Sequence, residues 1–287
     1  MNNQIIEVIV GPTAIGKTAW SIERALQLDA HIISADAFQV YKEMEIGTAK
    51  PSLIEQKKAP HHLLDIHNPN EQYNVSDFLY RCNQLITKLK QDDHPILICG
   101  GTGYYINCFI KNISFQTIPP SDLTIQHELN LQLEKEGSLS LWHHLSKIDP
   151  IIANNIHPNN HRRIIRALEL FKLTGKPPSN FSQIENAQRK DIKLIGINSE
   201  RTKVYDNIEL RVDQMIQQGL IEEVKSLILN YPKDAPGFQA IGYKEVILYL
   251  ENKINKDEMI NLIKKNTRRF AKRQLTWFKR FHDVEWI

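Results

Sequence analysis

The chemically most informative segment lies near the N-terminus, where glycines are combined with a lysine and a threonine. It matches the pattern G-x-x-x-x-G-K-[ST] and consists of Gly11, Pro12, Thr13, Ala14, Ile15, Gly16, Lys17 and Thr18. Glycines let such a loop wrap closely around an anion, so that backbone N–H groups and the start of the next helix face it. Lys17 adds a positive charge, and the Thr18 hydroxyl can hold Mg²⁺ bridged to phosphate oxygens. The segment therefore predicts a phosphate-binding loop with a magnesium site.

A second candidate group is the carboxylate of Asp36, which follows the apolar run 30–35. In kinases and nucleoside triphosphatases, an aspartate at the end of a further strand usually helps to hold Mg²⁺. The other candidate strand, 96–99, is followed instead by Gly-Gly-Thr-Gly-Tyr at 100–104, which contains no acid. Residue spacing alone leaves two readings of Asp36 open, a catalytic carboxylate or an outer partner of the magnesium ion.

The elements that must position these groups alternate between strands and helices. Short apolar runs at 5–10, 30–36 and 94–101 predict buried strands. A helical pattern follows the glycine loop through Leu28, and an amphipathic stretch at 75–90 separates the second and third strands. This alternation is typical of a parallel sheet with helical crossovers. We therefore expect an α/β fold with a P-loop NTPase-like parallel core.

The character of the chain changes after about residue 115. Helices are expected at 121–148 and 159–174, and a strand returns at 193–198. Further helices are expected at 202–218, 220–230, 241–251 and 257–280. The sequence thus predicts a discontinuous core, 1–115 and 190–287, interrupted by a helical insertion at 116–189.

Composition narrows the class of protein further. The 287 residues are 41% hydrophobic and 24% charged, and no apolar run approaches the roughly 20 residues of a membrane span. The N-terminus lacks the features of a signal peptide. Neither the cysteines nor the paired histidines have metal-ligand spacing, and an odd number of cysteines suits reduced thiols. These features indicate a cytoplasmic protein that does not enter a membrane.

The positive charge is concentrated near the C-terminus, where 264–280 carries eight Lys or Arg and no acid. Because the stretch contains no acid, salt bridges at i,i+4 within it cannot neutralise the positive charge, and the like charges repel one another. RNA phosphates would offset that repulsion and give a salt-dependent affinity. The basic residues singled out for this role are Lys265, Arg268, Arg269, Lys272, Arg273, Lys279 and Arg280.

Several segments together resemble the tRNA dimethylallyltransferase (tRNA isopentenyltransferase) family. Besides the glycine loop, they are ISADAFQVYKEMEIGTAKP (33–51), PHHLLDI (60–66), ILICGGTGYY (96–105), HRRIIRALELFKLTGKPPS (161–179), LRVDQMIQQGLIEEV (210–224), FQAIGYKE (238–245) and RRFAKRQLTWFKR (268–280). They occur in family order and extend nearly from end to end of the chain. The resemblance is therefore far more specific than the glycine loop alone.

The resemblance implies a reaction and its catalytic residues. A dimethylallyl group would pass from dimethylallyl diphosphate, held by the loop in place of ATP, to the exocyclic amine of an adenosine in the anticodon stem-loop. That adenosine is position 37, 3′-adjacent to the anticodon, in tRNAs that read codons beginning with U. Asp36 would take the proton of the amine, Thr102 would hydrogen-bond the bridging oxygen of the diphosphate, and Arg211 would neutralise its departing charge. Family members are typically monomers.

The resemblance also implies contacts with tRNA, whose target base must leave its stack to react. The positions implied are Asp36, Ala37, Phe38, Gln39, Thr102, Gln126, Arg162, Arg163, Ile164, Ile165, Arg166, Gln239, Gly242, Tyr243, Lys244, Lys272, Arg273, Gln274, Trp277 and Lys279. Gln126 and Asn207 stand where the family often has arginine, which predicts weaker peripheral contacts with RNA.

Three rival functions remain to be weighed. An adenylate isopentenyltransferase would use the same chemistry on AMP or ATP, but a mononucleotide does not need the basic C-terminal segment. A nucleotide or metabolite kinase is disfavoured by the absence of an acid after 96–99. A non-catalytic RNA-binding protein would leave the glycine loop without a role.

Overall fold

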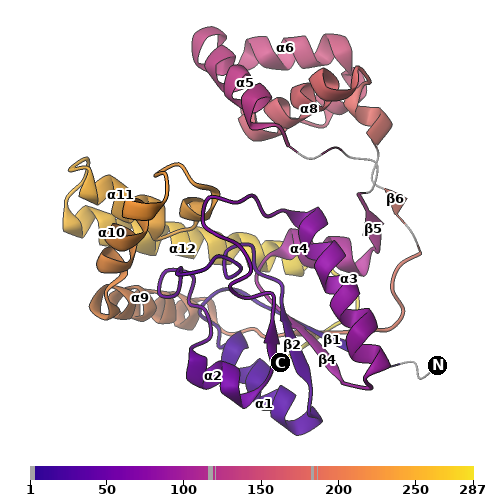
Figure 1. Cartoon of the computed structure of the whole chain (residues 1–287), viewed down its shortest axis with the longest axis vertical. Coiled ribbons are helices and arrows are strands. Elements are labelled where there is room, and N and C mark those ends of the chain that lie inside the picture. Colours follow the sequence, from indigo (N-terminus) through magenta and orange to yellow (C-terminus); the bar gives the residue numbers. More distant parts are fainter. Residues whose placement is uncertain (1–3, 116–118, 120, 182–183, 186) are drawn as a thin grey trace. The chain divides into compact units, whose positions relative to one another are not determined.

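The computed structural model describes residues 4–115, 119, 121–181, 184–185 and 187–287. The described chain forms two compact units (Figure 1). The core unit comprises Met1–Lys111 and Gln188–Ile287, and the helical unit comprises Asn112–Ala187. The boundaries expected from the sequence, 115/116 and 189/190, lie close to this division.

Within the described residues, the core unit contains a six-stranded sheet in the order β3-β2-β4-β1-β7-β8. All of its neighbouring strands run parallel. The strands are β1 (Ile6–Val10), β2 (His31–Ser34), β3 (His61–His62), β4 (Ile96–Cys99), β7 (Ile192–Gly196) and β8 (Val284–Trp286). The α/β class with a P-loop-like parallel core is therefore confirmed. The short edge strands β3 and β8 were not expected, because runs of two or three residues carry too little periodicity.

Burial on both faces explains why the central strands are apolar throughout. All five residues of β1 are buried, as expected for a strand covered on both sides. On one face, Ile9, Ile32 and Leu97 form a cluster with Ile22 and Ala25 of α1 (Lys17–Leu28). The connections between strands carry α2 (Leu53–Lys58), α3 (Val75–Gln91) and α4 (Gly103–Ile110).

Helices complete the core unit beyond β7. They are α9 (Arg201–Gln218), α10 (Leu220–Asn230), the 3₁₀ turn η2 (Pro236–Gln239), α11 (Tyr243–Leu250) and α12 (Lys256–Phe278). The start of α12 is fixed by a capping box, in which Asn255 and Glu258 bond each other's backbone N–H groups. α12 packs against α9 and α11. These helices agree closely with the expected ranges.

The helical unit has a core of its own. Its helices are α5 (Leu123–Glu136), α6 (Ser138–Ile148), α7 (Pro150–Asn154), α8 (His161–Thr174) and the 3₁₀ turn η1 (Pro178–Phe181). Leu129, Leu141, Leu145 and Leu168 are buried together. β5 (Ile113–Ser114) pairs antiparallel with β6 (Ile184–Glu185). The single helix expected at 121–148 is wrong: Gly137 adopts φ 80°, which ends α5 and begins α6.

Nowhere in the described part of the chain is a helix both long and apolar enough to cross a membrane.

Candidate active site

Parallel strands bring the candidate residues to one edge of the sheet. The glycine loop follows β1, Asp36 follows β2, and the Gly100–Thr102 turn follows β4. These three strands are neighbours, so their carboxyl ends meet at the same edge, where ligands of open α/β sheets bind.

The glycine loop needs its glycines for two different physical reasons. A Cβ at Gly11 would lie 2.6 Å from the carbonyl oxygen of Ile197, so a side chain does not fit there. Gly16, the N-cap of α1, has φ 92°, a left-handed conformation that other residues rarely adopt. As a glycine, Gly16 has no side chain with which to cap the start of α1. Its first N–H groups therefore remain available to an anion.

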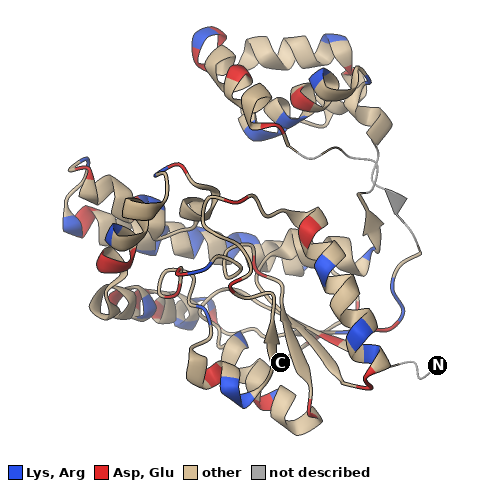
Figure 2. Ribbon diagram, viewed as in Figure 1, with Lys and Arg blue, Asp and Glu red and all other residues tan. Residues whose placement is uncertain are grey.

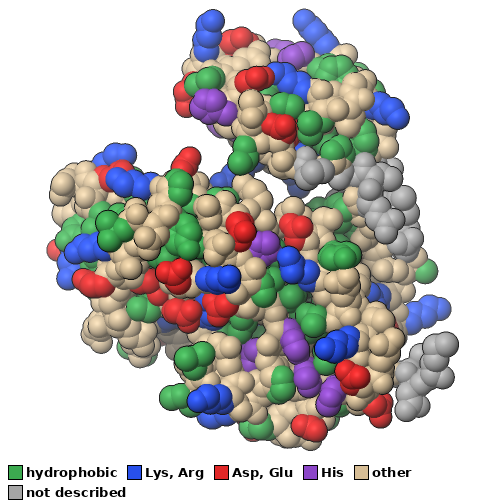
Figure 3. All heavy atoms as spheres, viewed as in Figure 1, with side chains coloured by type: hydrophobic (Ala, Val, Ile, Leu, Met, Phe, Trp, Pro, Cys, Tyr) green, Lys and Arg blue, Asp and Glu red, His purple; other side chains and the backbone are tan. Residues whose placement is uncertain are grey.

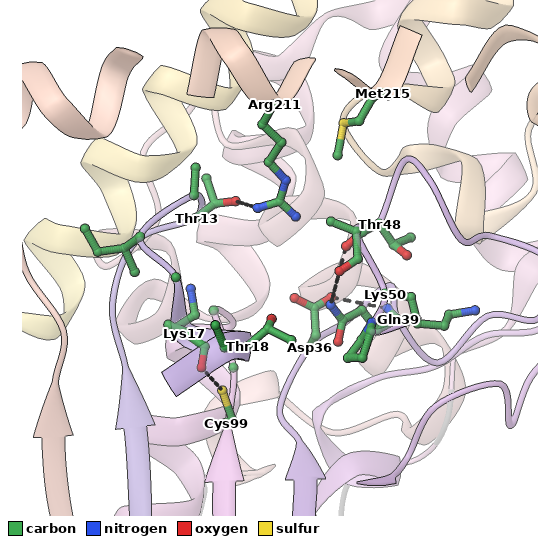
Figure 4. A pocket seen from close by; sticks show the side chains of 18 of the residues that line it. Thr13, Lys17, Thr18, Asp36, Gln39, Thr48, Lys50, Cys99, Arg211 and Met215 are labelled. Atoms are coloured by element: carbon green, nitrogen blue, oxygen red, sulfur yellow. Dashed lines mark hydrogen bonds between the residues drawn. The ribbon is translucent and has the colours of Figure 1, made fainter. Parts of the chain in front are cut away.

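A cavity of about 590 Å³ opens above this loop (Figure 4). Residues 13–18 of the loop line it, together with Asp36 and Arg211. Further lining residues come from the 39–52 segment, from α9 and from α12, and include Gln39, Ile46, Thr48, Ala49, Lys50, Met215, Phe270 and Gln274. The cavity thus combines a phosphate loop, cations, a carboxylate and apolar side chains.

Backbone hydrogen bonds orient the carboxylate. Oδ1 of Asp36 accepts from the N–H groups of Phe38 at 2.9 Å and Gln39 at 3.3 Å. The side chain therefore caps the turn that follows β2. Because these bonds use Oδ1, the other carboxylate oxygen retains its full capacity to accept.

The hydroxyl of Thr102 lies against the same turn. Its Oγ1 accepts from the N–H of Ala37 at 3.1 Å, and its own N–H donates to the carbonyl of Ala35 at 3.3 Å. As an acceptor in the first bond, the hydroxyl keeps its hydrogen for donation. Ala37 and Phe38 are half-buried beside it.

Two cations converge on Thr13 and the rest of the loop. Nζ of Lys17 donates to the carbonyl of Pro12 at 2.8 Å, and Nη1 of Arg211 donates to Oγ1 of Thr13 at 3.3 Å. Burial, together with the nearby Arg211, lowers the pKa of Lys17 to about 8. Burial also lowers the pKa of Arg211, whereas Asp36 raises it. Two partly desolvated cations are well suited to bind an anion.

Asn207 of α9 also faces the glycine loop, because its Nδ2 donates to the carbonyl of Ala14 at 3.2 Å. This residue was expected to affect RNA contacts, yet its hydrogen bond supports the phosphate loop.

Glu223, which was not expected from the sequence, fixes one wall of the cavity. Its carboxylate accepts from the backbone N–H groups of Glu45 (3.0 Å), Ile46 (2.8 Å) and Gly47 (3.2 Å). It also accepts from the hydroxyl of Tyr243 at 2.6 Å. Glu223 lies in a segment that carries the family resemblance, but its backbone partners at 45–47 are more than 170 residues away in sequence, and the sequence holds no signal of them.

Lys50 supports the same wall from within. Its side chain is fully buried, and Nζ donates to the carbonyl of Tyr41 at 2.8 Å and to Glu45 at 3.1 Å. It also forms an ion pair with Asp65. Gln39 is held similarly: Oε1 accepts from the Ser34 hydroxyl at 3.0 Å, while Nε2 donates to the carbonyl of Ala49 at 3.2 Å.

The positions expected to contact RNA from η2 to α12 fall into two groups. Exposed members are Gln239, Lys244, Lys272, Arg273 and Lys279. Gly242, Tyr243 and Gln274 are buried, and Trp277 is half-buried. Tyr243 packs on Gly47, where a Cβ would lie 2.3 Å from its ring. The side chains of Tyr243 and Gln274 are thus buried in the core unit, and contact of these two positions with RNA stays a prediction.

In the helical unit, Arg162 and Arg163 are exposed on α8. Ile164 is fully buried and Ile165 nearly so, both in the core of the unit. These two isoleucines therefore pack inside the helical unit, and contact of these positions with RNA stays a prediction.

The two remaining residues of the helical unit that were expected to contact RNA both bond to buried Glu169. It forms an ion pair with Arg166 at 2.8 Å and accepts from Nε2 of Gln126 at 3.2 Å. Arg166 also donates to the carbonyl of Pro119 at 2.5 Å. Arg166 and Gln126 therefore have structural partners inside the unit.

The basic stretch of α12 is not free of acids once folded. Arg268 pairs with Glu209 at 2.5 Å, and Lys264 pairs with Asp213 at 2.8 Å, both across to α9. Figure 2 shows acidic and basic residues together on this part of the core unit. The expectation that Arg268 offers an unpaired charge to RNA is thus wrong, because its partner belongs to another helix. Lys272 and Arg273 remain exposed.

A magnesium ion fits the donors present. Mg²⁺ usually keeps several waters and takes one or two protein oxygens plus phosphate oxygens, and the Thr18 hydroxyl at the start of α1 can supply one of these. Across the described residues, no group of three or more His, Cys, Asp or Glu could hold a metal ion. Figure 3 shows histidine side chains on one face of the core unit. The rings of His31 and His62 stack with their centroids 5.2 Å apart.

Comparison with known proteins gives a consistent family. A model described as IPP transferase matches residues 39–281. The tRNA dimethylallyltransferase of Alkaliphilus oremlandii is 44% identical, and the match covers 97% of this chain and 90% of that protein. The tRNA dimethylallyltransferase of Halalkalibacterium halodurans is also 44% identical, with 97% and 89% covered.

Solved structures show the same similarity. The full-length tRNA isopentenylpyrophosphate transferase from Bacillus halodurans is 42% identical, with a TM-score of 0.73 and coverage of 99% of this chain and 89% of that chain. A eukaryotic dimethylallyltransferase acting on tRNA is 29% identical, with a TM-score of 0.81 and coverage of 98% and 73%.

The lowered pKa of Lys17 predicts that removing its charge stabilises the folded chain but weakens anion binding. We expect Lys17→Met to abolish binding of inorganic diphosphate. We also expect it to raise the free energy of unfolding at pH 7 by about 1 kcal/mol, because it removes a cation whose burial is costly. The gain is smaller than the full pKa shift implies, because the side chain keeps some contact with solvent. Urea unfolding and calorimetry measure the two effects.

The sign of the pH dependence provides a further check. The pKa of Lys17 is lower in the folded chain, about 8 against 10.5, so the unfolded chain binds more protons between these values. The cost of burying the Lys17 cation therefore falls, and the wild type becomes more stable, as pH rises through this window. The difference in free energy of unfolding between Lys17→Met and the wild type should shrink accordingly. Exposed Lys57→Met serves as a control and should change neither property.

Proposed function

The chain belongs to the IPP transferase family of tRNA dimethylallyltransferases, and from that premise we propose how its cavity carries out the reaction. The enzyme transfers a dimethylallyl group from dimethylallyl diphosphate to the exocyclic amine of adenosine 37, in tRNAs that read codons beginning with U. Diphosphate is released. One observation carries the proposal: the phosphate loop, Lys17, Arg211 and Asp36 line a single cavity.

The leaving group is the first requirement of this chemistry. As the bond between C1 of the dimethylallyl group and the bridging oxygen breaks, negative charge builds on the diphosphate. Lys17, Arg211 and the N–H groups at the start of α1 stabilise that charge in place, which is the main way in which enzymes speed such steps. The Thr102 hydroxyl, which keeps its hydrogen, donates to the bridging oxygen.

The nucleophile is the second requirement. The amine of adenine is weakly nucleophilic, because its lone pair is delocalised into the ring. Its nitrogen attacks C1, and the carboxylate of Asp36 accepts a hydrogen bond from the amine and takes the surplus proton. The N–H groups of Phe38 and Gln39 hold the carboxylate in orientation, so little reorganisation is needed.

Mg²⁺ is the proposed cofactor, and the Thr18 hydroxyl would help to hold it. When bound, it adds positive charge against the leaving group. The chain's own residues supply the remaining functions, which are to bind, orient and accept the proton.

Exposed cations favour RNA over a free mononucleotide as the acceptor. Lys272, Arg273 and Lys279 lie exposed on and just after α12, while Lys244 is exposed at the start of α11. Arg162 and Arg163 of the helical unit are further candidates for RNA phosphates. We propose that the enzyme acts as a monomer in the cytoplasm, where tRNA is found.

The reaction itself is tested by transfer of label. Purified protein is incubated with Mg²⁺ and labelled dimethylallyl diphosphate, together with an unmodified anticodon stem-loop, AMP or ATP. We expect label on the stem-loop alone, at the adenosine after the anticodon. Label on AMP or ATP would indicate an adenylate isopentenyltransferase. Phosphoryl transfer from ATP to a nucleoside would instead indicate a kinase.

Conservative variants separate chemistry from binding. Asp36→Asn keeps an oxygen for the N–H groups of the turn but removes the base, and we expect kcat to fall about 10²- to 10³-fold. Thr102→Val should lower kcat by about tenfold or more, while Thr102→Ser, which keeps the hydroxyl, should recover most of it. Stem-loop affinity, measured by filter binding, should stay within about twofold. A selective loss of stem-loop affinity would contradict these roles.

Salt dependence identifies the cations that bind phosphate. We expect the double variant Lys272→Ala, Arg273→Ala to weaken stem-loop binding and to reduce the slope of log K against log salt by roughly 1 to 2 units. Arg268→Ala is a matched control on the same helix, since Glu209 already pairs with it. Its slope should match that of the wild type. Equal slopes for the double variant and the wild type would refute the assignment of α12 to RNA.

A further inference from the structure

A buried glutamine on α12 joins two loops of the active site. Gln274 is 5% exposed. Its Oε1 accepts from the N–H of Thr13 at 2.8 Å, and its Nε2 donates to the carbonyl of Gly101 at 2.9 Å. One side chain therefore spans the phosphate loop after β1 and the turn after β4.

The chemistry of these two bonds requires a neutral amide. A backbone N–H can only donate and a carbonyl can only accept, so the side chain must offer an acceptor at one end and a donor at the other. Glutamate offers acceptors alone when ionised, and methionine has the length without either group. The site is also tight, because a Cβ at Gly101 would lie 2.4 Å from Nε2 of Gln274.

The same face of α12 makes a second contact with this turn. A Cβ at Gly103 would lie 2.4 Å from the ring of Trp277, and Trp277 meets Tyr104 edge to face at 6.4 Å. Residues 274 and 277 are three apart and thus share one helix face. Exposed Lys272 and Arg273 precede Gln274 on the same turn of the helix. α12 thus has an inner face that holds the diphosphate loops and an outer face that is basic.

Thr13 shows how directly the inner face reaches the diphosphate site. Its backbone N–H is held by Gln274 of α12, and its hydroxyl is held by Arg211 of α9. The peptide at the start of the phosphate loop is thereby fixed from two helices, and Gln274 holds this peptide and that of Gly101 beside the anion site.

We propose that Gln274 is a positioning residue that sets the separation of the phosphate loop and the Gly101–Thr102 turn. The affinity for diphosphate thereby depends on the placement of α12, the RNA-facing helix. This inference rests on the proposed function, because the outer face of α12 is taken to bind RNA. Since coupling between two ligands is reciprocal, RNA on the outer face strengthens diphosphate binding, and diphosphate strengthens RNA binding by the same factor.

Calorimetry of the full chain tests the proposal. Inorganic diphosphate with Mg²⁺ is titrated into wild type, Gln274→Met, Gln274→Glu and Thr276→Val, each with and without a saturating anticodon stem-loop. Thr276→Val is the matched control, because Thr276 is exposed on the same turn and its hydroxyl bonds only the carbonyl of Lys272 among the described residues. Thermal unfolding of each variant is recorded in parallel.

For the wild type we expect the stem-loop to tighten diphosphate binding about fivefold. Gln274→Met should weaken diphosphate binding about tenfold without RNA and should bring the coupling factor close to 1. Stem-loop affinity in the absence of diphosphate should remain within about twofold of wild type. In turnover, KM for dimethylallyl diphosphate should rise more than kcat falls. Gln274→Glu, which keeps the acceptor for Thr13 but sets a carboxylate against Gly101, should bind diphosphate no better than Gln274→Met.

The outcomes that overturn the proposal are distinct from those that overturn the function. If Gln274→Met binds diphosphate as the wild type does and with the same dependence on RNA, Gln274 has no positioning role, whatever its effect on thermal unfolding. If diphosphate binding weakens but the wild type shows no coupling, the link to the RNA-facing helix is refuted. A wild type that neither binds nor modifies the stem-loop refutes the proposed function, and the RNA-free titrations still decide whether Gln274 shapes the diphosphate site.

Discussion

The close approach of the turns after β2 and β4 is the constraint on which the rest of the site depends. A Cβ at Gly100 would lie 2.2 Å from the carbonyl oxygen of Ala35, so only glycine allows the two turns to touch. Thr102 then bonds Ala35 and Ala37, which places its hydroxyl next to the turn that carries Asp36. Because β1 lies beside β4, the same arrangement brings the phosphate loop within reach of one glutamine. The phosphate loop, the Thr102 hydroxyl and the Asp36 carboxylate are thus positioned by backbone contacts before any substrate binds.

Much of this arrangement is encoded locally and was therefore predictable. The β1 strand, the glycine loop and α1 follow from an apolar run, two glycines and a helical pattern, all within 28 residues. The order of strands and helices predicts a parallel sheet, whose geometry assigns the loops to one edge. The break at Gly137 was missed because the apolar pattern continues across it, although its positive φ ends the helix. β3 and β8 exist only through pairing with their neighbours.

The parts of the site that were not predictable depend on contacts between distant residues. Nothing near Glu223 indicates that it binds the backbone of 45–47. Charge counting likewise treated Arg268 as unpaired, because Glu209 lies 59 residues away on α9. Family resemblance predicts RNA contacts at Tyr243 and Gln274, but it does not reveal that their buried side chains bond Glu223 and the loops of the cavity. A motif identifies which positions matter, but only the fold shows what each side chain touches.

The way in which Glu223 holds the cavity wall has a consequence for engineering. Its carboxylate binds backbone N–H groups, so it holds the 45–47 segment without reference to the side chains at 45 and 46. Ile46, which lines the cavity, is thus free to change in size, while Gly47 is confined by the ring of Tyr243. The side chain at position 46 can therefore be changed while the backbone of 45–47 stays in place, which makes this position suitable for enlarging the cavity to accept bulkier alkyl donors.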